Sequence, residues 1–305
     1  MPSAVGAVAH RVVHGGAAFR EPTLLDDEVV AALEGLTELA PLHNAPALAA
    51  IGEARRLLPG IPHVAVFDTA FHATIPPDAY TYALPRRFRE ELGIRRYGFH
   101  GLSVQWASER VRVGRLVVCH LGGGCSVTAV RDGRSVDTTM GLTPLEGVPM
   151  GTRAGSVDPG ALLYLLRHGL TVDQLDQALE HESGLLGLSG SASVRDIERA
   201  EDDASQLALE VFSYRVAGAI AAATVALGGL DAVVFTAGIG ENSALVRRLV
   251  CARLGHLGVE LDEAANHSAE PDAEIARPGS AVRVVVLGAR EDLVAARAAR
   301  TLLGE

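Results

Sequence analysis

The feature that most constrains the fold lies beyond Gly114, where strand patterns, a glycine cluster and helix patterns follow one another in a fixed order. Leu116–His120 predicts a buried strand that leads into three consecutive glycines, Gly122–Gly124. Cys125–Val130 predicts a second strand, and Asp132-Gly133 is a strong signal for a hairpin turn into a third.

The remaining pattern beyond residue 115 predicts the third strand of this group, then helices and two further strands, so that the order becomes β-β-β, helices, β, α, β, α. The helices are expected at Asp158–Arg167, Thr171–Glu180 and Gln206–Leu227 and from Asn242 and Glu291, and the strands at Arg134–Thr138, Ala232–Thr236 and Val282–Leu287. Two glycine clusters therefore follow strands, where α/β sheets usually bind ligands, and only glycine lets a backbone approach a phosphate so closely. A tight turn explains either cluster about as well.

The first third of the chain alternates short strands and helices. The predicted strands are Val5–Val13, which ends in Gly15-Gly16, and His63–Phe67, which places Asp68 at its end. The predicted helices are Leu25–Leu39 and Pro46–Leu58, the second with Asn44 as its cap. Thr69–Gly101 is rich in Pro, Arg and Tyr and is expected to be an irregular functional loop.

Length and composition narrow the class of protein. A chain of 305 residues is long enough for two domains, and 48% apolar with 21% charged residues is ordinary globular composition. A net charge of −10 argues against a nucleic-acid partner. No apolar run reaches the ~20 residues of a membrane span, and the start of the chain does not match a signal peptide, so a cytoplasmic protein is expected. The three cysteines and the histidine spacing predict neither a disulfide framework nor a histidine-bound metal.

Six short segments resemble acetate kinase, of the acetate/sugar kinase, actin and chaperone ATPase superfamily. In order they are His10–Gly16 (HRVVHGG), Phe67–His72 (FDTAFH), Tyr97–Gly101 (YGFHG), His120–Gly124 (HLGGG), Met140–Gly160 (MGLTPLEGVPMGTRAGSVDPG) and Phe235–Ser243 (FTAGIGENS). Any one segment is weak evidence, whereas six in the same order are highly specific.

The resemblance implies an α/β, two-domain, actin-like (ribonuclease H-like) fold and reversible phosphoryl transfer from ATP to acetate, giving acetyl phosphate and ADP. It implies ATP/ADP and Mg²⁺ as cofactors and a homodimer as the assembly. Residues 1–113 correspond to the N-terminal substrate-side domain and residues 114–305 to the nucleotide-binding domain, with the last helix expected to pack back on the first.

Three residues match the family's catalytic groups, and Arg11 matches a substrate-binding arginine. Arg11 matches the arginine that holds the substrate carboxylate, while Arg153 and His100 match groups that stabilise the transferring phosphoryl group. Asp68 matches the active-site aspartate, often described as a proton donor or acceptor. Because a carboxylate nucleophile is already ionised at neutral pH, orienting Arg11 or a magnesium-bound water is the better physical role for Asp68.

Further positions match binding residues of the family. Val13, Leu42, Phe99 and Pro144 align with the pocket for the substrate methyl group, and His43 aligns with a secondary active-site histidine. Glu291 aligns with a glutamate that helps to hold magnesium, although a glutamate favoured at a helix start is nearly as good an interpretation. The expected nucleotide contacts are His120, Leu121, Gly122, Gly123, Gly124, Arg195, Gly238, Ile239, Gly240, Glu241 and Asn242.

The sequence also departs from the family pattern. Acetate kinases open with a hairpin carrying Asn-Ala-Gly-Ser-Ser-Ser, which is not found in this sequence, so an incomplete N-terminal domain and little acetyl phosphate are expected. Ala192–Arg195 replaces a family segment that is one residue longer and contains an aspartate. Ser156 occupies a position where the family usually has an aspartate, and Val104 occupies one where it usually has a histidine. Two alternatives remain open: a non-catalytic remnant that binds nucleotide or a partner, and a kinase that prefers propionate or butyrate.

Overall fold

The computed structural model describes residues 5–304, apart from the side chains of residues 41 and 42. The described chain divides into two compact units, and each is considered by itself. The first unit holds the chain up to Trp106 together with Leu142–Pro144 and the segment from Arg290 onward. The second unit holds Ala107–Gly141 and Leu145–Ala289.

The first unit is built on a three-stranded sheet of order β1-β3-β2. β1 (Val8–Val12) lies parallel to β3 (His63–Phe67), and the short β2 (Thr23–Leu24) pairs antiparallel with the other edge of β3. All five residues of β3 are buried, as expected for a central strand covered on both faces.

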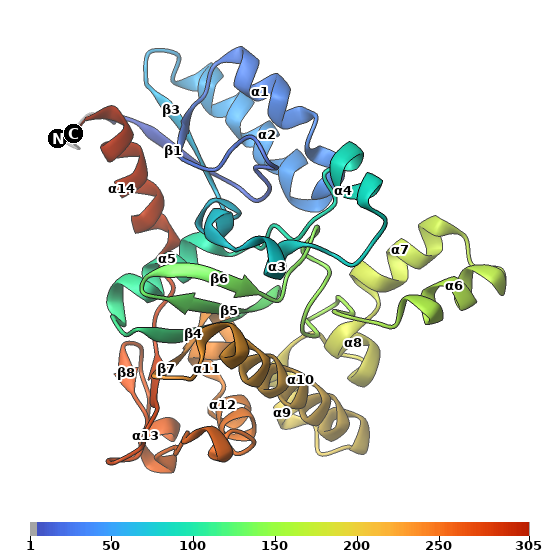
Figure 1. Ribbon diagram of the computed structural model, residues 1–305, viewed down its shortest axis with the longest axis vertical. Coiled ribbons are helices and arrows are strands. Elements are labelled where there is room, and N and C mark those ends of the chain that lie inside the picture. The colour runs from blue at the N-terminus through green and yellow to red at the C-terminus, as the bar shows by residue number, and fades with distance from the viewer. Residues whose placement is uncertain (1–4, 305) are drawn as a thin grey trace. The chain divides into compact units, whose positions relative to one another are not determined.

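Helices cover both faces of this sheet (Figure 1). α1 (Asp27–Glu34) and α2 (Pro41–Leu57) pack on the face that carries Val12, Ala65 and Phe67. α14 (Glu291–Leu303) packs on the opposite face, against Val64 and Val66. Because side chains alternate along a strand, successive residues of β1 pack against helices on opposite faces of the sheet.

The segment that follows β3 contains more regular structure than the sequence predicted. It forms a 3-10 helix at Ala70–Thr74, α3 (Pro77–Tyr80) and α4 (Arg86–Leu92), and α5 (Gly101–Arg110) follows. Prolines open α3 and precede α4, positions at which the missing N–H costs nothing. The expectation of an irregular loop over Thr69–Gly101 was therefore wrong for these helices.

The second unit contains a six-stranded mixed sheet of order β6-β5-β4-β7-β9-β8. Its strands are β4 (Arg115–Leu121), β5 (Cys125–Arg131), β6 (Arg134–Thr138), β7 (Ala232–Thr236), β8 (Ala273–Glu274) and β9 (Arg283–Val286). β4, β7 and β9 are parallel, whereas β5, β6 and β8 join as antiparallel neighbours. The predicted hairpin is confirmed, because Asp132 and Gly133 adopt φ of 49° and 78°, the left-handed pair that a tight turn needs.

The helices of the second unit are α6 (Pro159–Arg167), α7 (Val172–His181), α8 (Gly184–Ser189), α9 (Val194–Arg199), α10 (Asp203–Leu227), α11 (Ala237–Asn242), α12 (Ala244–Cys251) and α13 (Glu263–His267). α10 is long and apolar enough to cross a membrane, but it packs on β4, β5, β6, α8, α9 and α12. Its buried apolar residues are therefore explained by its place in the core of this unit.

Several predicted boundaries need correction. The first strand is Val8–Val12 rather than Val5–Val13, and the helix predicted at Leu25–Leu39 is α1 followed by a 3-10 turn. Asn44 does not cap a helix, because α2 begins at Pro41 and the Asn44 side chain bonds the backbone of His14 instead. The helix predicted to begin at Asn242 begins at Ala244, with Ser243 as its cap.

Candidate active site

Arg11 lies between two carboxylates in the first unit. Its Nε and Nη2 donate to the two carboxylate oxygens of Asp68, at 2.8 and 2.6 Å, and its Nη1 lies 2.8 Å from Glu291 Oε2. Asp68 directly follows β3, and Arg11 lies on the neighbouring strand β1. Glu291 is the first residue of α14, which packs on one face of this sheet, so the three residues meet. The predicted contact between Asp68 and Arg11 is therefore present.

The arrangement leaves part of the Arg11 guanidinium available to a ligand. A guanidinium has five N–H donors, and three are used by Asp68 and Glu291, so two remain. The Arg11 side chain is 40% exposed, whereas that of Asp68 is 1% exposed. A fixed, partly exposed guanidinium with two remaining N–H groups is suited to a small carboxylate.

The electrostatics of this cluster show a surplus of negative charge. Burial alone would lower the pKa of Arg11, but the charges of Asp68 and Glu291 raise it well above its usual value. Burial raises the pKa of Glu291, Arg11 opposes this, and the nearby Asp68 adds to the rise. Two carboxylates facing one guanidinium leave a net charge of −1, which favours a further cation.

His100 is held beside the Asp68 backbone by an unusual turn. It has φ of 59°, which is uncommon for a residue with a side chain, and Gly101 N–H donates to Asp68 O at 2.9 Å. A Cβ on Gly101 would lie 2.1 Å from that oxygen, so only glycine permits this approach. The His-Gly pair thus fixes His100 at the start of α5, next to the loop that carries Asp68.

His14 contacts the rings of Tyr97 and Phe99 in the first unit, a role that the sequence did not reveal. It is fully buried, its Nδ1 accepts from Gly16 N–H, and its Nε2 lies 3.0 Å from Leu142 O. Burial lowers the pKa of His14 to about 4, while the bond to Leu142 works against that change, so the ring is neutral at pH 7. His14 thereby ties the Leu142–Pro144 segment to the end of β1.

The predicted methyl-pocket residues all belong to this unit. Phe99 and Pro144 are buried and Val13 is half-buried, and the Phe99 ring lies 5.3 Å from that of His14. His43 is half-buried on α2, next to the Asn44 side chain that holds β1. The Leu42 side chain lies outside the described part of the chain.

In the second unit, the glycine loop after β4 lies beside the turn after β7. His120 is nearly buried at the end of β4, and Gly122 N–H donates to Gly124 O at 3.0 Å. Because β4 and β7 are parallel neighbours, both loops leave the same edge of the sheet, and a Cβ on Gly122 would lie 3.5 Å from Ala237 Cβ. By contrast, a Cβ on Gly123 would meet nothing within 4 Å. This loop therefore presents open backbone.

The predicted nucleotide segment Gly238–Asn242 forms the helix α11 rather than a loop ahead of one. Glu241 Oε1 accepts from the N–H groups of Ala237 and Ala289, each at 2.9 Å. Asn242 Nδ2 donates to Gly238 O. These two side chains hold the turn after β7, so the backbone of the segment is the part that remains for a ligand.

Arg153 is fixed by a carboxylate that the sequence did not single out. Its Nε lies 3.1 Å from Glu180 Oε2, and the two side chains are 13% and 17% exposed. The surrounding loop is compact, since a Cβ on Gly184 would lie 2.2 Å from Met150 O. Gly151 N–H donates to Gly123 O at 3.3 Å, which brings the Arg153 loop against the glycine loop.

Arg195 lies exposed on α9, whose cap is the Ser193 side chain. A Cβ on Gly151 would lie 3.5 Å from Ala192 O, so the segment that carries Arg195 adjoins the Arg153 loop. The second unit thus brings together His120, the glycine loop, Arg153 and the short Ala192–Arg195 segment.

Comparisons with known proteins agree on one family. A family model described as the Acetokinase family matches residues 2–297. An acetate kinase from a Synechococcus strain is 50% identical over 311 residues, covering 98% of this chain and 77% of that protein. An acetate kinase from Halothermothrix orenii is 48% identical over 306 residues, covering 96% of this chain and 77% of that protein.

Solved structures give the same result. A propionate kinase from Francisella tularensis has a TM-score of 0.92 at 38% identity, covering 96% of this chain and 78% of that one. An acetate kinase from Porphyromonas gingivalis has a TM-score of 0.92 at 38% identity, covering 98% and 78% respectively.

Proposed function

This chain belongs to the acetokinase family, and from that premise we propose the residues that carry out its reaction. Its fold is the actin-like fold of the acetate kinases. It is an ATP-dependent phosphotransferase that moves phosphate between ATP and acetate and uses Mg²⁺, as the family does. This function is favoured over a non-catalytic remnant and over a preference for propionate or butyrate.

We propose that Arg11 binds the acetate carboxylate through the two N–H groups that Asp68 and Glu291 leave available. The single observation that carries this proposal is the two-point hydrogen bonding of Arg11 by Asp68. A guanidinium fixed in this way loses little freedom when the substrate binds. Val13, Leu42, Phe99 and Pro144 are proposed to enclose the methyl group, and His43 is proposed to support them.

The reaction forms a bond between an acetate oxygen and the γ-phosphorus, and it breaks the bond between that phosphorus and the β,γ-bridging oxygen. The electron pair of the broken bond leaves with ADP. Charge builds on the phosphoryl oxygens, so donors to those oxygens accelerate the step. We assign this work to His100 and Arg153. Asp68 is assigned the orientation of Arg11, because an ionised acetate needs no general base.

The donors near Arg11 fit a magnesium ion. Mg²⁺ prefers hard oxygen ligands and is usually held by one or two carboxylates together with substrate phosphates. Glu291 supplies such a carboxylate, and the surplus negative charge of its cluster with Asp68 and Arg11 favours a divalent cation. We therefore propose that Glu291 holds the ion, which would neutralise phosphate charge when bound.

The second unit is proposed to bind the nucleotide. The contacts are assigned to the His120–Gly124 loop, to Gly238, Ile239, Gly240, Glu241 and Asn242, and to Arg195. The division of the chain at residue 113 into a substrate-side domain and a nucleotide-binding domain is part of the same proposal. Open backbone at Gly123 supports it, because a phosphate needs that close approach.

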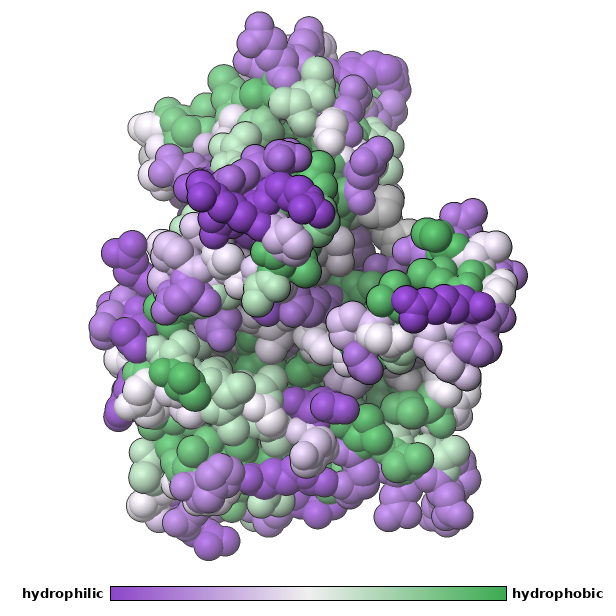
Figure 2. Space-filling view, turned by 45° about the vertical axis from the view of Figure 1, so that its right-hand side comes forward, coloured by the Kyte–Doolittle hydropathy of each residue, from purple (hydrophilic) through white to green (hydrophobic). Residues whose placement is uncertain are grey.

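We propose a cytoplasmic homodimer that binds neither nucleic acid nor membrane, consistent with a net charge of −10. Apolar side chains are exposed on α6 and α7, where Figure 2 shows green surface at the right of the view, and also on α10. They include Leu163, Tyr164, Val172, Leu207, Tyr214 and Val225. Patches of this kind mark protein interfaces, and sedimentation velocity measures whether a dimer forms.

A hydroxamate assay with ATP and acetate tests the assignment of Arg11. Arg11→Lys keeps the charge but loses the planar fork, so the Michaelis constant for acetate is expected to rise on the order of 10-fold or more. The Michaelis constant for ATP is expected to change little. Arg112→Lys, on an exposed arginine outside the cluster, is the matched control. An unchanged acetate constant in Arg11→Lys contradicts the assignment.

A further inference from the structure

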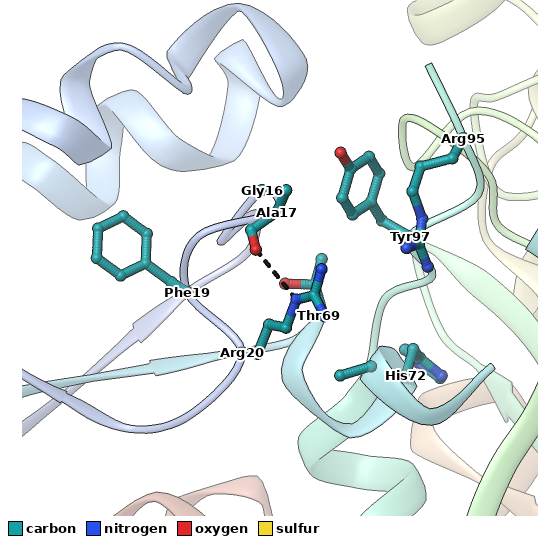
Figure 3. A pocket seen from close by; sticks show the side chains of 9 residues that line it. Gly16, Ala17, Phe19, Arg20, Thr69, His72, Arg95 and Tyr97 are labelled. Atoms are coloured by element: carbon teal, nitrogen blue, oxygen red, sulfur yellow. Dashed lines mark hydrogen bonds between the residues drawn. The ribbon is translucent and has the colours of Figure 1, made fainter. Parts of the chain in front are cut away.

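A small recess in the first unit is lined by two arginines and does not include Arg11, Asp68 or Glu291. Its walls are Gly16, Ala17, Phe19, Arg20, Thr69, His72, Ala73, Arg95 and Tyr97. Figure 3 shows Arg20 reaching past Thr69 and Arg95 running beside Tyr97. The enclosed volume is about 20 Å³, which is room for one or two water-sized groups, and the recess is partly open to solvent, so a larger anion would lie partly at the surface.

The charges of these two arginines are not balanced by carboxylates. Arg20 Nε donates to Ala17 O, and Arg95 Nε donates to Arg96 O. The Arg95 guanidinium lies 3.6 Å from the centre of the Tyr80 ring and 5.2 Å from that of Tyr97. Within residues 5–304, neither Arg20 nor Arg95 forms an ion pair with an Asp or Glu side chain.

The two guanidinium groups are close enough to influence each other. Burial lowers the pKa of Arg95, and the positive charge of Arg20 is one of the further causes of that change. Like charges that face one recess repel unless an anion lies between them. The lining of the recess contains no Asp or Glu, so an anionic ligand is the counter-charge that would relieve this repulsion.

Thr69 adds a neutral donor at the same place. It is nearly buried, and its Oγ1 accepts from Gly15 N–H at 3.1 Å. Within the described chain its hydroxyl hydrogen has no assigned acceptor, so it is available to a group in the recess. Two guanidinium forks and a hydroxyl suit the oxygens of a dianion.

We propose that Arg20, Arg95 and Thr69 form a second anion site, which binds a phosphate group apart from the catalytic cluster. The chemistry is that of a phosphate dianion, supplied by free inorganic phosphate or by the terminal group of a small phosphomonoester. The site joins three segments: the turn after β1, the turn after Asp68, and the Arg95–Tyr97 segment that leads to His100. An anion bound there links these three segments and orders the Arg95–Tyr97 segment that precedes His100.

Titration calorimetry with inorganic phosphate, at constant ionic strength, tests the site on the whole protein. Arg20→Ala is expected to weaken this binding at least tenfold, because it removes one of the two charges. Arg95→Lys is expected to weaken it as well, because lysine keeps the charge but not the planar stack on Tyr80. Arg112→Ala is the matched control, as an exposed arginine outside the recess.

Two further measurements make the outcome decisive. Hydrogen exchange over residues 95–101 is expected to slow in phosphate for the parent and the Arg112→Ala variant, but not for Arg20→Ala. Methyl phosphate is run in parallel: binding of both ligands assigns the site to phosphomonoesters, and binding of inorganic phosphate alone assigns it to the free ion. Isotherms that stay within about twofold of the parent in both Arg20→Ala and Arg95→Lys overturn the proposal. Because no readout uses turnover, such a failure is separate from a failure of the kinase assignment.

Discussion

Arg153 Nε lies 3.1 Å from Glu180 Oε2 at the end of α7, and both side chains are mostly buried. Burial raises the pKa of Glu180, and the charge of Arg153 acts against that rise. A mostly buried guanidinium held by one carboxylate has few other orientations. We therefore propose that Glu180 is a positioning residue, which acts through Arg153.

Glu180→Gln is therefore expected to lower kcat on the order of 10-fold, a cost typical of losing a supporting partner of a site residue. The Michaelis constants for acetate and ATP should change little, because the role proposed for Arg153 is a contact with the transferring group in the transition state. Steady-state kinetics measures this split. Glu182→Gln changes an exposed neighbour and serves as the control. Equal losses in the two variants would show that Glu180 has no special role.

Arg153→Lys is expected to lower turnover far more than it raises the acetate Michaelis constant. The loss of one donor to a developing charge costs ~3 kcal/mol, on the order of 100-fold in kcat. Lysine retains the charge, but it lacks the planar fork that lets arginine contact Glu180 and donate to a phosphoryl oxygen at the same time. Turnover within about twofold of the parent would remove Arg153 from the catalytic residues.

Asp68→Asn tests whether the fixed orientation of Arg11 matters. An amide in place of the carboxylate presents an N–H to the guanidinium and removes one of its two acceptors. Small misplacement of a binding group costs ~100-fold in rate, so kcat/KM for acetate is expected to fall by about that factor. The exposed Asp78, changed to Asn, is the control. A normal kcat/KM in Asp68→Asn would contradict the proposal that Asp68 orients Arg11.

Gly123→Val tests the nucleotide loop. Because a Cβ at this position meets no atom within 4 Å, the substitution should leave the thermal midpoint unchanged. The new side chain occupies the open space beside the backbone, so the affinity for magnesium-ADP should fall by at least about tenfold, or 1.4 kcal/mol. Calorimetry measures the affinity. Gly218→Ala on α10, where space is equally open, is the control, and retained affinity in Gly123→Val would count against this loop.

The buried histidines His14 and His72 should make stability depend on mild acid. Burial lowers the pKa of each from the usual 6.5 to about 4, so the unfolded chain binds protons that the folded chain does not. This contribution to stability is complete above pH 6.5 and decreases as the pH falls toward 4. At pH 5 the loss is on the order of 2 kcal/mol for each histidine.

Thermal unfolding at pH 7.5 and pH 5.0 measures that dependence. His72→Gln keeps a donor for Phe99 O and removes the titration, so it should reduce the difference between the two midpoints. His168→Gln, on an exposed histidine, should leave the difference as in the parent. Equal midpoints at the two pH values in the parent would contradict the prediction.

Local signals in the sequence were enough for many elements. The helices predicted from Asp158 and Thr171 are present as α6 and α7, and Asp132-Gly133 forms the predicted hairpin between β5 and β6. These features depend on the conformations of a few adjacent residues, so neighbouring residues predict them. Asn44 shows the limit, since its amide is used by a distant backbone and not by its own helix.

The contacts of the candidate site needed the tertiary structure. The sequence by itself determined the order of the motifs, the α/β pattern and the side chains that could take part. It did not indicate that Glu291 shares Arg11 with Asp68, that Glu180 holds Arg153, or that Arg20 and Arg95 face one recess. Such pairs form where strand register and helix packing bring remote charges within a few ångströms. Their energies depend on that distance and on burial, which no local pattern encodes.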